Sequence, residues 1–585
     1  MAGPWRRGMS DQRVLAKEFE IIAALLEISG ANAFRVNATK KVSRVLQDFE
    51  GDLHAIAATP GGLEALDGIG KSSAEKIRQW CDAGTIDELE TLRSEIPPGL
   101  IGLLDISGLG PKTVGRLWRE TDIVDRAGLA RGIEDGTLAA LPRMGAKTIA
   151  NIKDSLEFAE QAAERTSIGI ALPLAELLLE ELGSLPGVNS IEYAGSLRRG
   201  CETIGDIDLL ATCDDPAPLI ETFTQAPGVT KVLASGDTKA SIRLKDGIQV
   251  DLRIIDAEAI GAARMYFTGS KEHNVKLRHL AQARSLRLNE YGLFPDDGQQ
   301  EPPQQRGIAP IAAATEEDIY AALDLPFHPP ELREERDAIE IPPPPLLTLA
   351  DIACDLHTHT TASDGHLPIA AMAEEAMRCG YHTLAITDHS RSSVQANGLS
   401  VERLLEHVAA IREVDAATPG IRLLAGSEVD IHADGSLDYD DDVLAMLDLV
   451  VASPHAALRQ PPEEATSRLI AAVSHRHVHV LGHPTGRMIG RRPGLEPDMR
   501  AVAEAAAKHG TALEINANPS RLDLRDRHVR IAMESGALIS INTDAHAAAH
   551  FAFMRYGVLT GRRGGLTSEQ CINAWQADRL LAWLD

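Results

Sequence analysis

The residues best suited to metal chemistry are concentrated in the last part of the chain. Sixteen of the 20 histidines follow residue 350, and only four precede it. Several follow short apolar runs, and if these runs are parallel strands, their carboxyl ends bring the side chains to one pole of a barrel. The candidate ligands are His357, His359, Asp364, His389, Glu428, His455, His483, Asp544 and His546. Imidazole and carboxylate suit Mn²⁺, Zn²⁺ or Fe²⁺, and a Glu that bridges two close ions favours hydroxide at neutral pH. We therefore expect two or three divalent metal ions here.

The other histidines of this part are expected to be structural, because a lone His is more often a core or surface residue than a ligand. They are His366, His382, His407, His432, His475, His477, His479, His509, His528 and His550.

A second acidic cluster lies in the middle of the chain. Asp206 and Asp208 are two residues apart on a predicted strand, so their side chains leave the same face. Asp251, on another predicted strand, would complete a set of three carboxylates. Such groups lie close together only if cations neutralise them, and hard oxygen ligands suit Mg²⁺ or Mn²⁺.

A turn just before this cluster is suited to holding phosphate. Gly195 and Ser196 offer a backbone amide and a hydroxyl, and Arg198 and Arg199 follow directly. The alternative is a solvated strand edge with a basic turn. The acidic pair follows closely on the Gly-Ser-Arg-Arg turn, which favours the phosphate site.

Three segments near the N-terminus resemble the helix-hairpin-helix motif: LDGIGKSSAEKI (66–77), ISGLGPKTVGRL (106–117) and LPRMGAKTIANI (141–152). Glycines let the turn bring backbone N–H groups close to a phosphate, and the following helix N-terminus favours negative charge. Such contacts read no sequence. A Gly-x-Gly turn before a helix is also common without function, and the third copy has Arg143 in place of its first Gly. The expected DNA contacts are Gly68, Gly70, Gly108, Gly110, Lys112, Gly145 and Lys147.

The elements that position these residues change along the chain. Residues 1–165 have helical spacing of apolar residues, and short strand-like runs appear at 207–212, 241–245 and 248–255. Residues 256–300 are expected to be helical, and a proline-rich stretch around 326–345 is the best linker. Beyond residue 351, short apolar strands at 384–387, 447–453, 478–483, 512–516 and 538–544 alternate with helices. This alternation predicts parallel strands in a β/α architecture.

Composition restricts the class of protein. Hydrophobic residues make up 44% and charged residues 24%, as in globular proteins. No long apolar run suggests a membrane span, no signal peptide is indicated, and the six cysteines form no CxxC pair, so we expect reduced thiols and a cytoplasmic protein. The formal charge is -27, with an excess of acidic residues on both sides of residue 350. Any DNA contact must therefore come from local patches and backbone amides.

The middle of the chain resembles family X DNA polymerases. GSLRRG followed by GDIDLL resembles their nucleotidyltransferase signature, and YFTGSKEHNVKLR (266–278) resembles their nucleotide- and template-contacting segment. The resemblance implies that Asp206, Asp208 and Asp251 bind metal, with Asp251 helping to activate the primer 3′-hydroxyl. It implies that the nucleotide is contacted by Gly195, Ser196, Arg199, Gly205, Arg165, Tyr266, Phe267, Gly269, Asn274 and Arg278. Lys76 stands where some members carry a Schiff-base lysine for lyase chemistry, and the alternative is a phosphate-contacting or solvated Lys.

The last part resembles the PHP domain, a distorted seven-stranded β/α barrel with a trinuclear metal site that hydrolyses phosphoesters. The resemblance implies that the nine candidate ligands bind metal, and Asn518 and Arg521 are candidates to touch the substrate phosphate.

The whole chain thus resembles a bacterial family X DNA polymerase with a C-terminal PHP domain. The implied fold is a multidomain α/β protein with helical hairpin domains at 1–85 and 86–165, and a nucleotidyltransferase palm with a mixed sheet at 166–260. A thumb-like domain at 261–328, a linker at 329–350 and the barrel at 351–585 would follow. The implied function is gap filling in DNA repair on gapped or 3′-recessed DNA with dNTPs, by a monomer. The barrel would add Mn²⁺-dependent 3′-5′ exonuclease activity, and a 3′-phosphatase or abasic-site endonuclease activity is a further candidate.

Two alternatives remain open from the sequence. One is a small-molecule phosphoesterase with a DNA-binding front end, against which the set Asp206, Asp208 and Asp251 argues. The other is a DNA-end-binding scaffold with inactive centres.

Overall fold

The computed structural model of the chain describes residues 11–584, apart from residues 48, 50, 51, 67, 107, 143, 163, 164 and 246. The chain forms two compact units. One comprises Met1–Glu164 and Met488–Pro493, and the other comprises Arg165–Arg487 and Gly494–Asp585. Among the described residues, no helix is both long enough and apolar enough to cross a membrane.

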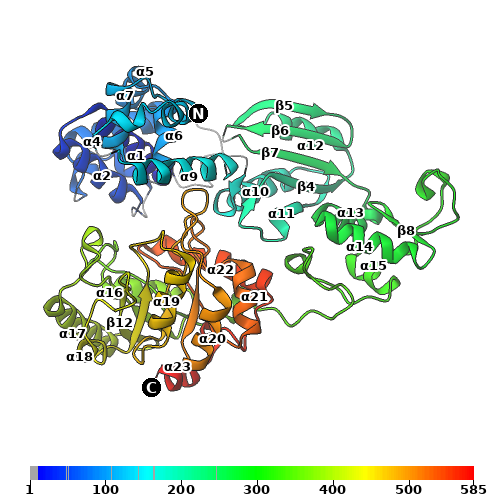
Figure 1. Cartoon of the computed structure of the whole chain (residues 1–585). Coiled ribbons are helices and arrows are strands. Elements are labelled where there is room, and N and C mark those ends of the chain that lie inside the picture. The colour runs from blue at the N-terminus through cyan, green and yellow to red at the C-terminus, as the bar shows by residue number, and fades with distance from the viewer. Residues whose placement is uncertain are drawn as a thin grey trace. The chain divides into compact units, whose positions relative to one another are not determined.

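The first unit is helical (Figure 1). Its helices are α1 (Asp11–Ser29), α2 (Ala33–Gln47), α3 (Leu53–Ala58), α4 (Lys71–Ala83), α5 (Asp87–Glu95), α6 (Gly99–Gly102), α7 (Pro111–Glu120), α8 (Arg126–Glu134) and α9 (Ala146–Ala162). Phe19, Ile22, Leu25 and Leu26 of α1 are buried, as their helical spacing predicts.

Three turns of this unit have the same local structure. A 3₁₀ turn (Leu63–Ala65, Leu103–Asp105 or Leu138–Ala140) precedes α4, α7 and α9. Between turn and helix, Ile69, Leu109 and Met144 are buried, and each donates its N–H to the carbonyl of the residue three positions earlier. The third segment therefore shares the geometry of the other two, although Arg143 lies outside the described residues.

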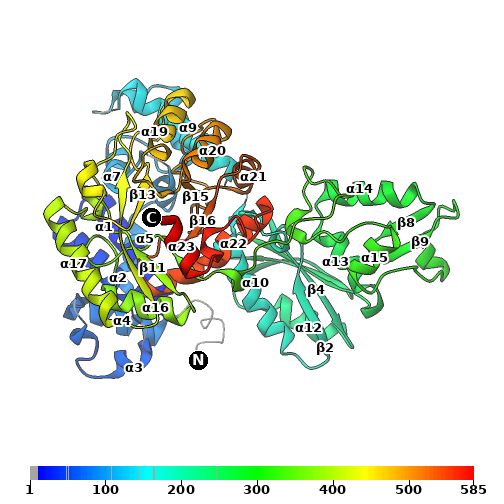
Figure 2. The same ribbon diagram turned by 90° about the horizontal axis from the view of Figure 1, so that it is seen from below.

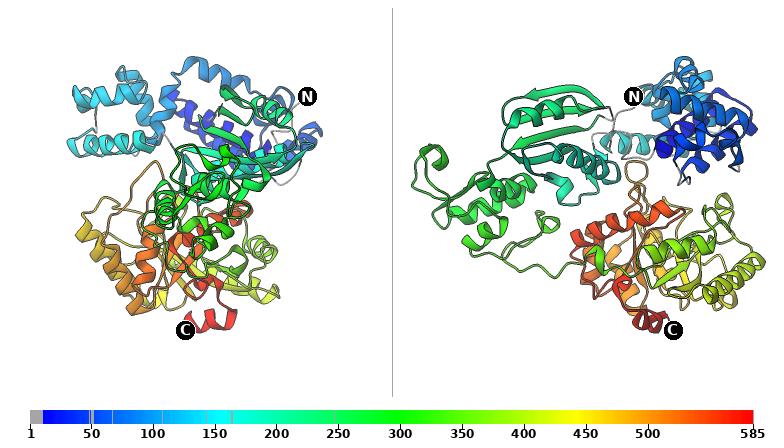
Figure 3. Two further views of the ribbon diagram at one scale, coloured as in Figure 1. Left: turned by 90° about the vertical axis from the view of Figure 1, so that its right-hand side faces the viewer. Right: turned by 180° about the vertical axis from the view of Figure 1, so that it is seen from behind.

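A five-stranded mixed sheet opens the second unit (Figure 3). The strand order is β2 (Val188–Tyr193), β4 (Asp206–Cys213), β7 (Gln249–Ile254), β6 (Lys239–Leu244) and β5 (Val229–Ser235). β4 and β7 are parallel and the other neighbours antiparallel. The helix α10 (Ile168–Gly183) contacts β2, and α12 (Pro216–Thr224) contacts β5 and β6. The short strands β1 (Thr166–Ser167) and β3 (Thr203–Ile204) pair with each other.

The next segment packs around its own small core. It contains α13 (Ile260–Thr268), α14 (Lys271–Gln282), the hairpin β8 (Leu286–Asn289) and β9 (Gly292–Pro295), and α15 (Glu316–Ala322). The expectation of helix throughout 256–300 was wrong for the hairpin. There, Leu288, Leu293 and Phe294 are buried on two strands joined by a tight turn. The start of the expected linker is also packed, since Leu332, Arg333 and Ile339 are buried.

Seven parallel strands form the C-terminal domain, in chain order across the sheet. They are β10 (Cys354–Asp355), β11 (Thr383–Ile386), β12 (Arg422–Asp430), β13 (Leu449–Ser453), β14 (Val480–Leu481), β15 (Ala512–Asn516) and β16 (Ile539–Asn542). A parallel bridge between Thr358 and Ala545 joins the two ends of the sheet. The expected distorted seven-stranded β/α barrel is therefore confirmed, and it is nearly closed.

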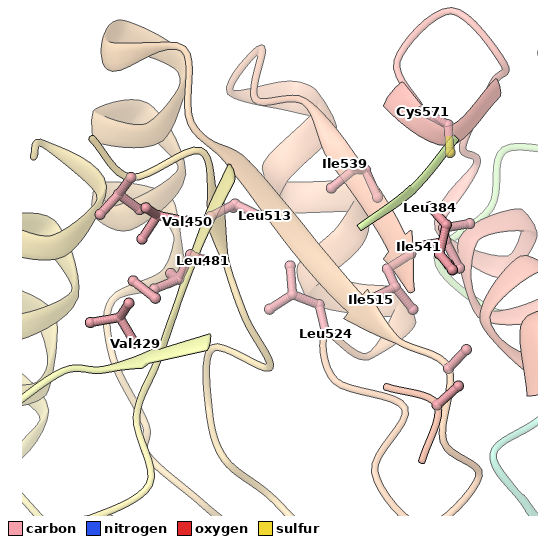
Figure 4. Close-up of a cluster of buried hydrophobic side chains, with 14 of the residues drawn as sticks. Leu384, Val429, Val450, Leu481, Leu513, Ile515, Leu524, Ile539, Ile541 and Cys571 are labelled. Atoms are coloured by element: carbon pink, nitrogen blue, oxygen red, sulfur yellow. The ribbon is translucent and has the colours of Figure 1, made fainter. Parts of the chain in front are cut away.

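Helices follow the strands and cover the barrel (Figure 2). They are α16 (Ile369–Arg378), α17 (Val401–Ala417), α18 (Asp441–Leu444), α19 (Pro462–Val473), α20 (Met499–His509), α21 (Asp526–Glu534), α22 (Met554–Gly564) and α23 (Ala577–Leu584). Figure 4 shows part of the core, where Val450, Leu513, Ile515 and Ile541 of the strands lie among other buried apolar side chains. Strands covered on both faces are apolar along most of their length, which holds their ends in fixed positions.

Within the second unit, an ion pair and a hydrogen bond join the mixed-sheet domain to the barrel. Arg487 donates to both carboxylate oxygens of Glu202, at 3.0 and 2.6 Å, and only 3% of its side chain is exposed. The Ser167 hydroxyl donates to the Pro519 carbonyl at 3.0 Å. These contacts tie β1 and the loop before β3 to two loops at the rim of the barrel.

Candidate active sites

The nine ligands expected in the barrel come from the carboxyl ends of six strands. His357 and His359 follow β10, with Asp364 in the next loop, and His389 follows β11. Glu428 lies near the end of β12. His455 follows β13, His483 follows β14, and Asp544 and His546 follow β16. The parallel order of the strands explains why residues far apart in the sequence meet at one pole.

Eight of the nine fall into three overlapping groups. In each group the ligand atoms all lie within 4.8 Å of one another. The groups are His359, Asp364, His389 and His546; His357, His359 and Asp544; and His389, Glu428 and His455. His359 and His389 are each shared by two groups, so the three candidate cation positions are adjacent.

The ninth residue, His483, contacts these groups through Glu428, and the nine residues together are called the cage below. Its Nε2 lies 2.9 Å from Glu428 Oε1. Glu428 also lies close to His389, whose Nδ1 is 2.9 Å from Oε2, and to His455, whose Nε2 is 3.3 Å from Oε1. Glu428 is therefore the central carboxylate of the cage.

The electrostatics of the cage reflect this crowding. Burial raises the pKa of Glu428, but the surrounding His455, His357 and His389 hold it well below its usual range. Burial lowers the pKa of His389, but Glu428 and Asp364 raise it to about 11. His359, which is buried beside His546 and His389, has its pKa lowered to about 4. Neighbouring imidazoles in one site thus favour opposite protonation states.

The chemistry of the donor set fits divalent cations. His357 Nε2, both ring nitrogens of His359, His389 Nδ1 and Glu428 Oε2 are buried and form no hydrogen bond of good geometry in the described part of the chain, although His389 Nδ1 and Glu428 Oε2 lie 2.9 Å apart. An unsatisfied buried polar atom costs about 1–3 kcal/mol, so several of them in one site would be a large penalty. Coordination of cations removes that penalty, because each of these atoms is a good ligand.

Several residues that position the ligands of the cage were not predicted from the sequence. Glu514 on β15 lies 2.8 Å from His357 Nδ1 and accepts a hydrogen bond from the His483 backbone N–H at 2.6 Å. Asp430 contacts His455 Nδ1, and Asn516 donates to Asp544 at 3.0 Å. Carboxylates behind ligating histidines fix the ring orientation and raise ligand basicity. The available signal was a Glu inside the apolar strand ALEIN, where an unpaired carboxylate would be costly.

The second candidate site lies on the mixed sheet. Asp208 on β4 and Asp251 on β7 are direct neighbours across the parallel pair, and Asp206 lies two residues before Asp208 on the same strand. Burial raises the pKa of Asp208 to about 7, with further contributions from Asp206 and Asp251. Asp251 is held by the Gln249 amide at 3.0 Å and by the Ser241 hydroxyl. A divalent cation held between the three carboxylates would offset their mutual repulsion.

The turn before β4 lies directly against these carboxylates. Gly195 has a φ of +62°, and a Cβ there would lie 2.4 Å from Asp208 Oδ2. Gly195 begins α11 (Gly195–Arg198), and Ser196, its next residue, is partly buried. The glycine thus lets the backbone approach the acidic cluster, as the phosphate-site interpretation requires.

The arginines near this turn have protein partners. Arg198 donates to both oxygens of Glu316, at 3.0 and 2.6 Å, so it does not point freely to a ligand. Arg199 donates to the Thr268 carbonyl at 2.6 Å and pairs with Glu334 at 3.1 Å. Arg165 donates to Thr203. Its guanidinium lies 3.3 Å from where a Cβ of Gly205 would be, and Gly205 directly precedes Asp206 in the sequence.

The segment 266–278 lies near the same turn. Arg199 reaches it through the Thr268 carbonyl, and a Cβ at Gly269 would be 3.4 Å from the Arg199 guanidinium. Tyr266 and Phe267 form an edge-to-face pair with ring centroids 5.2 Å apart. Asn274 donates to the Tyr266 carbonyl at 2.7 Å, and Arg278 donates to the Asn274 carbonyl at 3.3 Å. These residues form one connected patch beside the phosphate turn.

The hairpin glycines of the first unit are accessible. Gly70, Gly110 and Gly145 are exposed, with open space where a Cβ would stand, and Gly68 and Gly108 have φ values of +96° and +97°. Lys112 and Lys147 are exposed on the helices that follow. Lys76 instead forms an ion pair with Glu88, which also binds Arg35. A paired ammonium is a poor nucleophile, so this contact favours a structural or phosphate-contacting role for Lys76 over Schiff-base chemistry.

Family models match four parts of the chain. A "Helix-hairpin-helix domain" covers residues 11–86 and a "SAM-like Helix-hairpin-helix tandem" covers 100–157. A "DNA polymerase beta thumb" covers 263–334 and a "PHP domain" covers 355–518. Together with the two acidic centres, these matches define a class: polymerases of the beta type joined to a metal-dependent PHP barrel.

Comparison with individual proteins narrows the class. The chain is 38% identical over 564 residues to "DNA polymerase/3'-5' exonuclease PolX" of Bacillus subtilis, an alignment that covers 95% of this chain and 96% of the relative. It is 33% identical over 205 residues to "Probable phosphatase YcdX" of Escherichia coli K12, covering 33% of this chain and 78% of that relative. The chain therefore belongs to the bacterial family X DNA polymerases that carry a C-terminal PHP domain.

Proposed function

We propose that this protein fills short gaps in DNA with its mixed-sheet domain and removes nucleotides from DNA 3′ ends with its barrel. The observation that carries the proposal is the presence, in one chain, of two separate ligand sets for divalent cations. One is the triad Asp206, Asp208 and Asp251 beside the Gly195 turn, and the other is the nine-residue cage.

In the palm, the chain's own residues position the reacting groups. Asp206 and Asp208 are proposed to hold both cations, and Asp251 to hold the one nearest the primer 3′-hydroxyl. Mg²⁺ or Mn²⁺ would lower the pKa of that hydroxyl and neutralise the leaving pyrophosphate. The Gly195 amide, Ser196, Arg199, Gly205 and Arg165 are proposed to hold the triphosphate. Tyr266, Phe267 and Gly269 would line the sugar pocket, while Asn274 and Arg278 would contact the new base pair and the template.

In the barrel, the three overlapping groups are proposed to hold three divalent cations, Mn²⁺, Zn²⁺ or Fe²⁺. Such ions would supply a hydroxide for phosphodiester hydrolysis at neutral pH. Asn518 and Arg521 are proposed to touch the substrate phosphate. Burial lowers the pKa of His483, and the nearby positive charge of Arg521 lowers it further.

The hairpins are proposed to hold the DNA backbone for both centres. Their exposed glycines offer backbone N–H groups at helix N-termini, which bind phosphate without a high net positive charge. The protein is acidic overall, so we expect binding that weakens steeply with salt.

The test is an assay of the full-length protein on two DNA substrates. We expect it to add one nucleotide to a one-nucleotide gap with dNTPs and Mg²⁺ or Mn²⁺, and to shorten a 3′-recessed duplex with Mn²⁺ and no dNTPs. EDTA should abolish both activities, and excess divalent metal should restore them. Activity that persists in EDTA, or end binding without turnover in any divalent metal, would refute the proposal.

A substitution at the phosphate turn tests the geometry of the palm. In Gly195→Ala, the new methyl group would displace Asp208, because a Cβ there lies 2.4 Å from its carboxylate. We expect gap filling to fall by about a hundredfold, the usual scale of an ångström-sized misplacement. Gly228→Ala is the control, since Gly228 has a φ of +88° but nothing within 4 Å of its Cβ position. Equal loss in both variants would show that backbone strain, and not contact with Asp208, matters.

A further inference from the structure

A buried carboxylate lies next to the barrel cage without belonging to its ligand groups. Asp388 is 0% exposed and immediately precedes the candidate ligand His389, just after β11. A fully buried carboxylate is costly unless hydrogen bonds and an opposite charge compensate it. Its partners therefore indicate what it does.

Most of those partners belong to the loop that carries Asp364. Asp388 Oδ1 accepts hydrogen bonds from the backbone N–H groups of Thr360 and Ser363, each at 3.0 Å, and from the Ser363 hydroxyl at 2.5 Å. Its Oδ2 accepts from the Thr360 hydroxyl at 2.8 Å. One carboxylate thus fixes two backbone amides and two side chains across a single turn of the chain.

The remaining partner comes from a helix on the outside of the barrel. His407 of α17 places Nε2 2.7 Å from Asp388 Oδ2. Five donors therefore surround the two carboxylate oxygens, which leaves Asp388 saturated and unsuited to bind a cation itself. The contact also gives His407, one of the histidines expected to be merely structural, a defined place behind the cage.

The loop fixed in this way leads directly into the first ligand group. The Ser363 hydroxyl lies 3.2 Å from Asp364 Oδ1. Asp364 in turn lies 3.6 Å from His389 Nε2 and 3.4 Å from His546 Nε2. Asp364 is the most exposed member of the cage, at 34%, so packing alone restrains it least. Asp388 thus contacts the loop of one ligand and is joined through the backbone to a second.

We propose that Asp388, oriented by His407, is a positioning residue that holds Asp364 and His389 in place for the cation bound by His359, Asp364, His389 and His546. The inference rests on the proposed function of the barrel. It assigns to Asp388 and His407 control over one of three cation positions, because Asp364, the ligand in the loop that they fix, belongs to this group alone, whereas His359 and His389 are shared with the other groups.

The experiment counts bound metal and measures both activities in the full-length protein. Purified variants are loaded with Mn²⁺, freed of excess ion by gel filtration and analysed for Mn²⁺ per chain. Digestion of a 3′-recessed duplex and filling of a one-nucleotide gap are measured on the same samples. The variants are Asp388→Asn, His407→Ala and His407→Gln. The control is Asp448→Asn, whose carboxylate binds Arg412 on the same helix α17, away from the cage.

For Asp388→Asn and His407→Ala we expect one Mn²⁺ fewer per chain than wild type and a 10- to 100-fold loss of digestion, the usual scale for removal of a group behind a metal ligand. Gap filling should stay at the wild-type rate. His407→Gln should recover most of the lost metal, because the Gln amide can still donate to Asp388. Asp448→Asn should match wild type in metal content and digestion.

The proposal would be overturned if Asp388→Asn and His407→Ala kept the wild-type metal content and digestion rate and showed at most a lower melting temperature. The contact between Asp388 and His407 would then serve only the stability of the fold. If Asp388→Asn does not fold, the metal content and digestion of the two His407 variants test the proposal. Absence of digestion by the wild type would refute the proposed function of the barrel, whereas the metal count would still test the positioning role.

Discussion

Asp208→Asn abolishes gap filling and leaves digestion of 3′-recessed DNA unchanged: this is the result we expect from the separation of the two centres. Asp208 is the neighbour of Asp206 on β4 and of Asp251 on β7, and burial together with these two carboxylates raises its pKa to about 7. An amide of the same size keeps the packing of β4 but removes the negative charge. We expect a loss of about a thousandfold or more, at the upper end of the effect of removing one group that stabilises transition-state charge.

The measurement is single-turnover primer extension on a one-nucleotide gap, followed by digestion assays on the same preparation. Asp237→Asn, an exposed carboxylate between β5 and β6, is the matched control and should extend primers normally. Gap filling at more than a tenth of the wild-type rate in Asp208→Asn would show that the palm triad does not hold the reacting groups.

The reciprocal change is Glu428→Gln in the barrel. Glu428 contacts His389, His455 and His483, and its charge offsets that of the surrounding imidazoles. A neutral side chain there removes the central anionic ligand. We expect digestion to fall by about a thousandfold or more, with fewer Mn²⁺ ions per chain, because ligand charge is what a divalent cation needs most in a buried site.

Gap filling by Glu428→Gln should remain at the wild-type rate, and Glu374→Gln on the exposed face of α16 should retain both activities. If Glu428→Gln also lost gap filling, the two centres would not be separable. If it kept digestion and its full metal content, the cage would not be the nuclease site. Each outcome is measured with the two DNA substrates used for Asp208→Asn.

The parallel strands of the barrel and its candidate ligand set could be predicted from the sequence because both have local signals. The strand predicted at 512–516 agrees with β15, and several of the candidate ligands follow a short apolar run. Parallel strands place those ends at one pole, so no knowledge of long-range contacts was needed. No strand was predicted at β12, which runs from Arg422 to Asp430, since Glu428 and Asp430 interrupt its apolar pattern. Only its candidate ligand Glu428 was singled out.

Other features depend on contacts that no local pattern reports. Strand β5 has an almost wholly exposed burial pattern, so its sequence carries no clear alternation. Arg198 follows the phosphate turn, but its partner Glu316 is more than a hundred residues away. Glu514 and Asp388 lie behind the cage and are distinguished only by which histidine or loop they reach. Their roles become visible only when the elements are packed together.

The Glu202–Arg487 pair has a consequence for any attempt to cut this protein into independent modules. A barrel expressed alone from residue 351 would lose the Glu202 carboxylate that pairs with Arg487, whose side chain is only 3% exposed in the intact chain. The isolated palm would likewise expose Glu202 and the loop around it. A charge left without its counterpart is usually more harmful than the absence of both partners. Truncated halves are therefore poor substitutes for the intact chain, and point substitutions are the sounder way to dissect it.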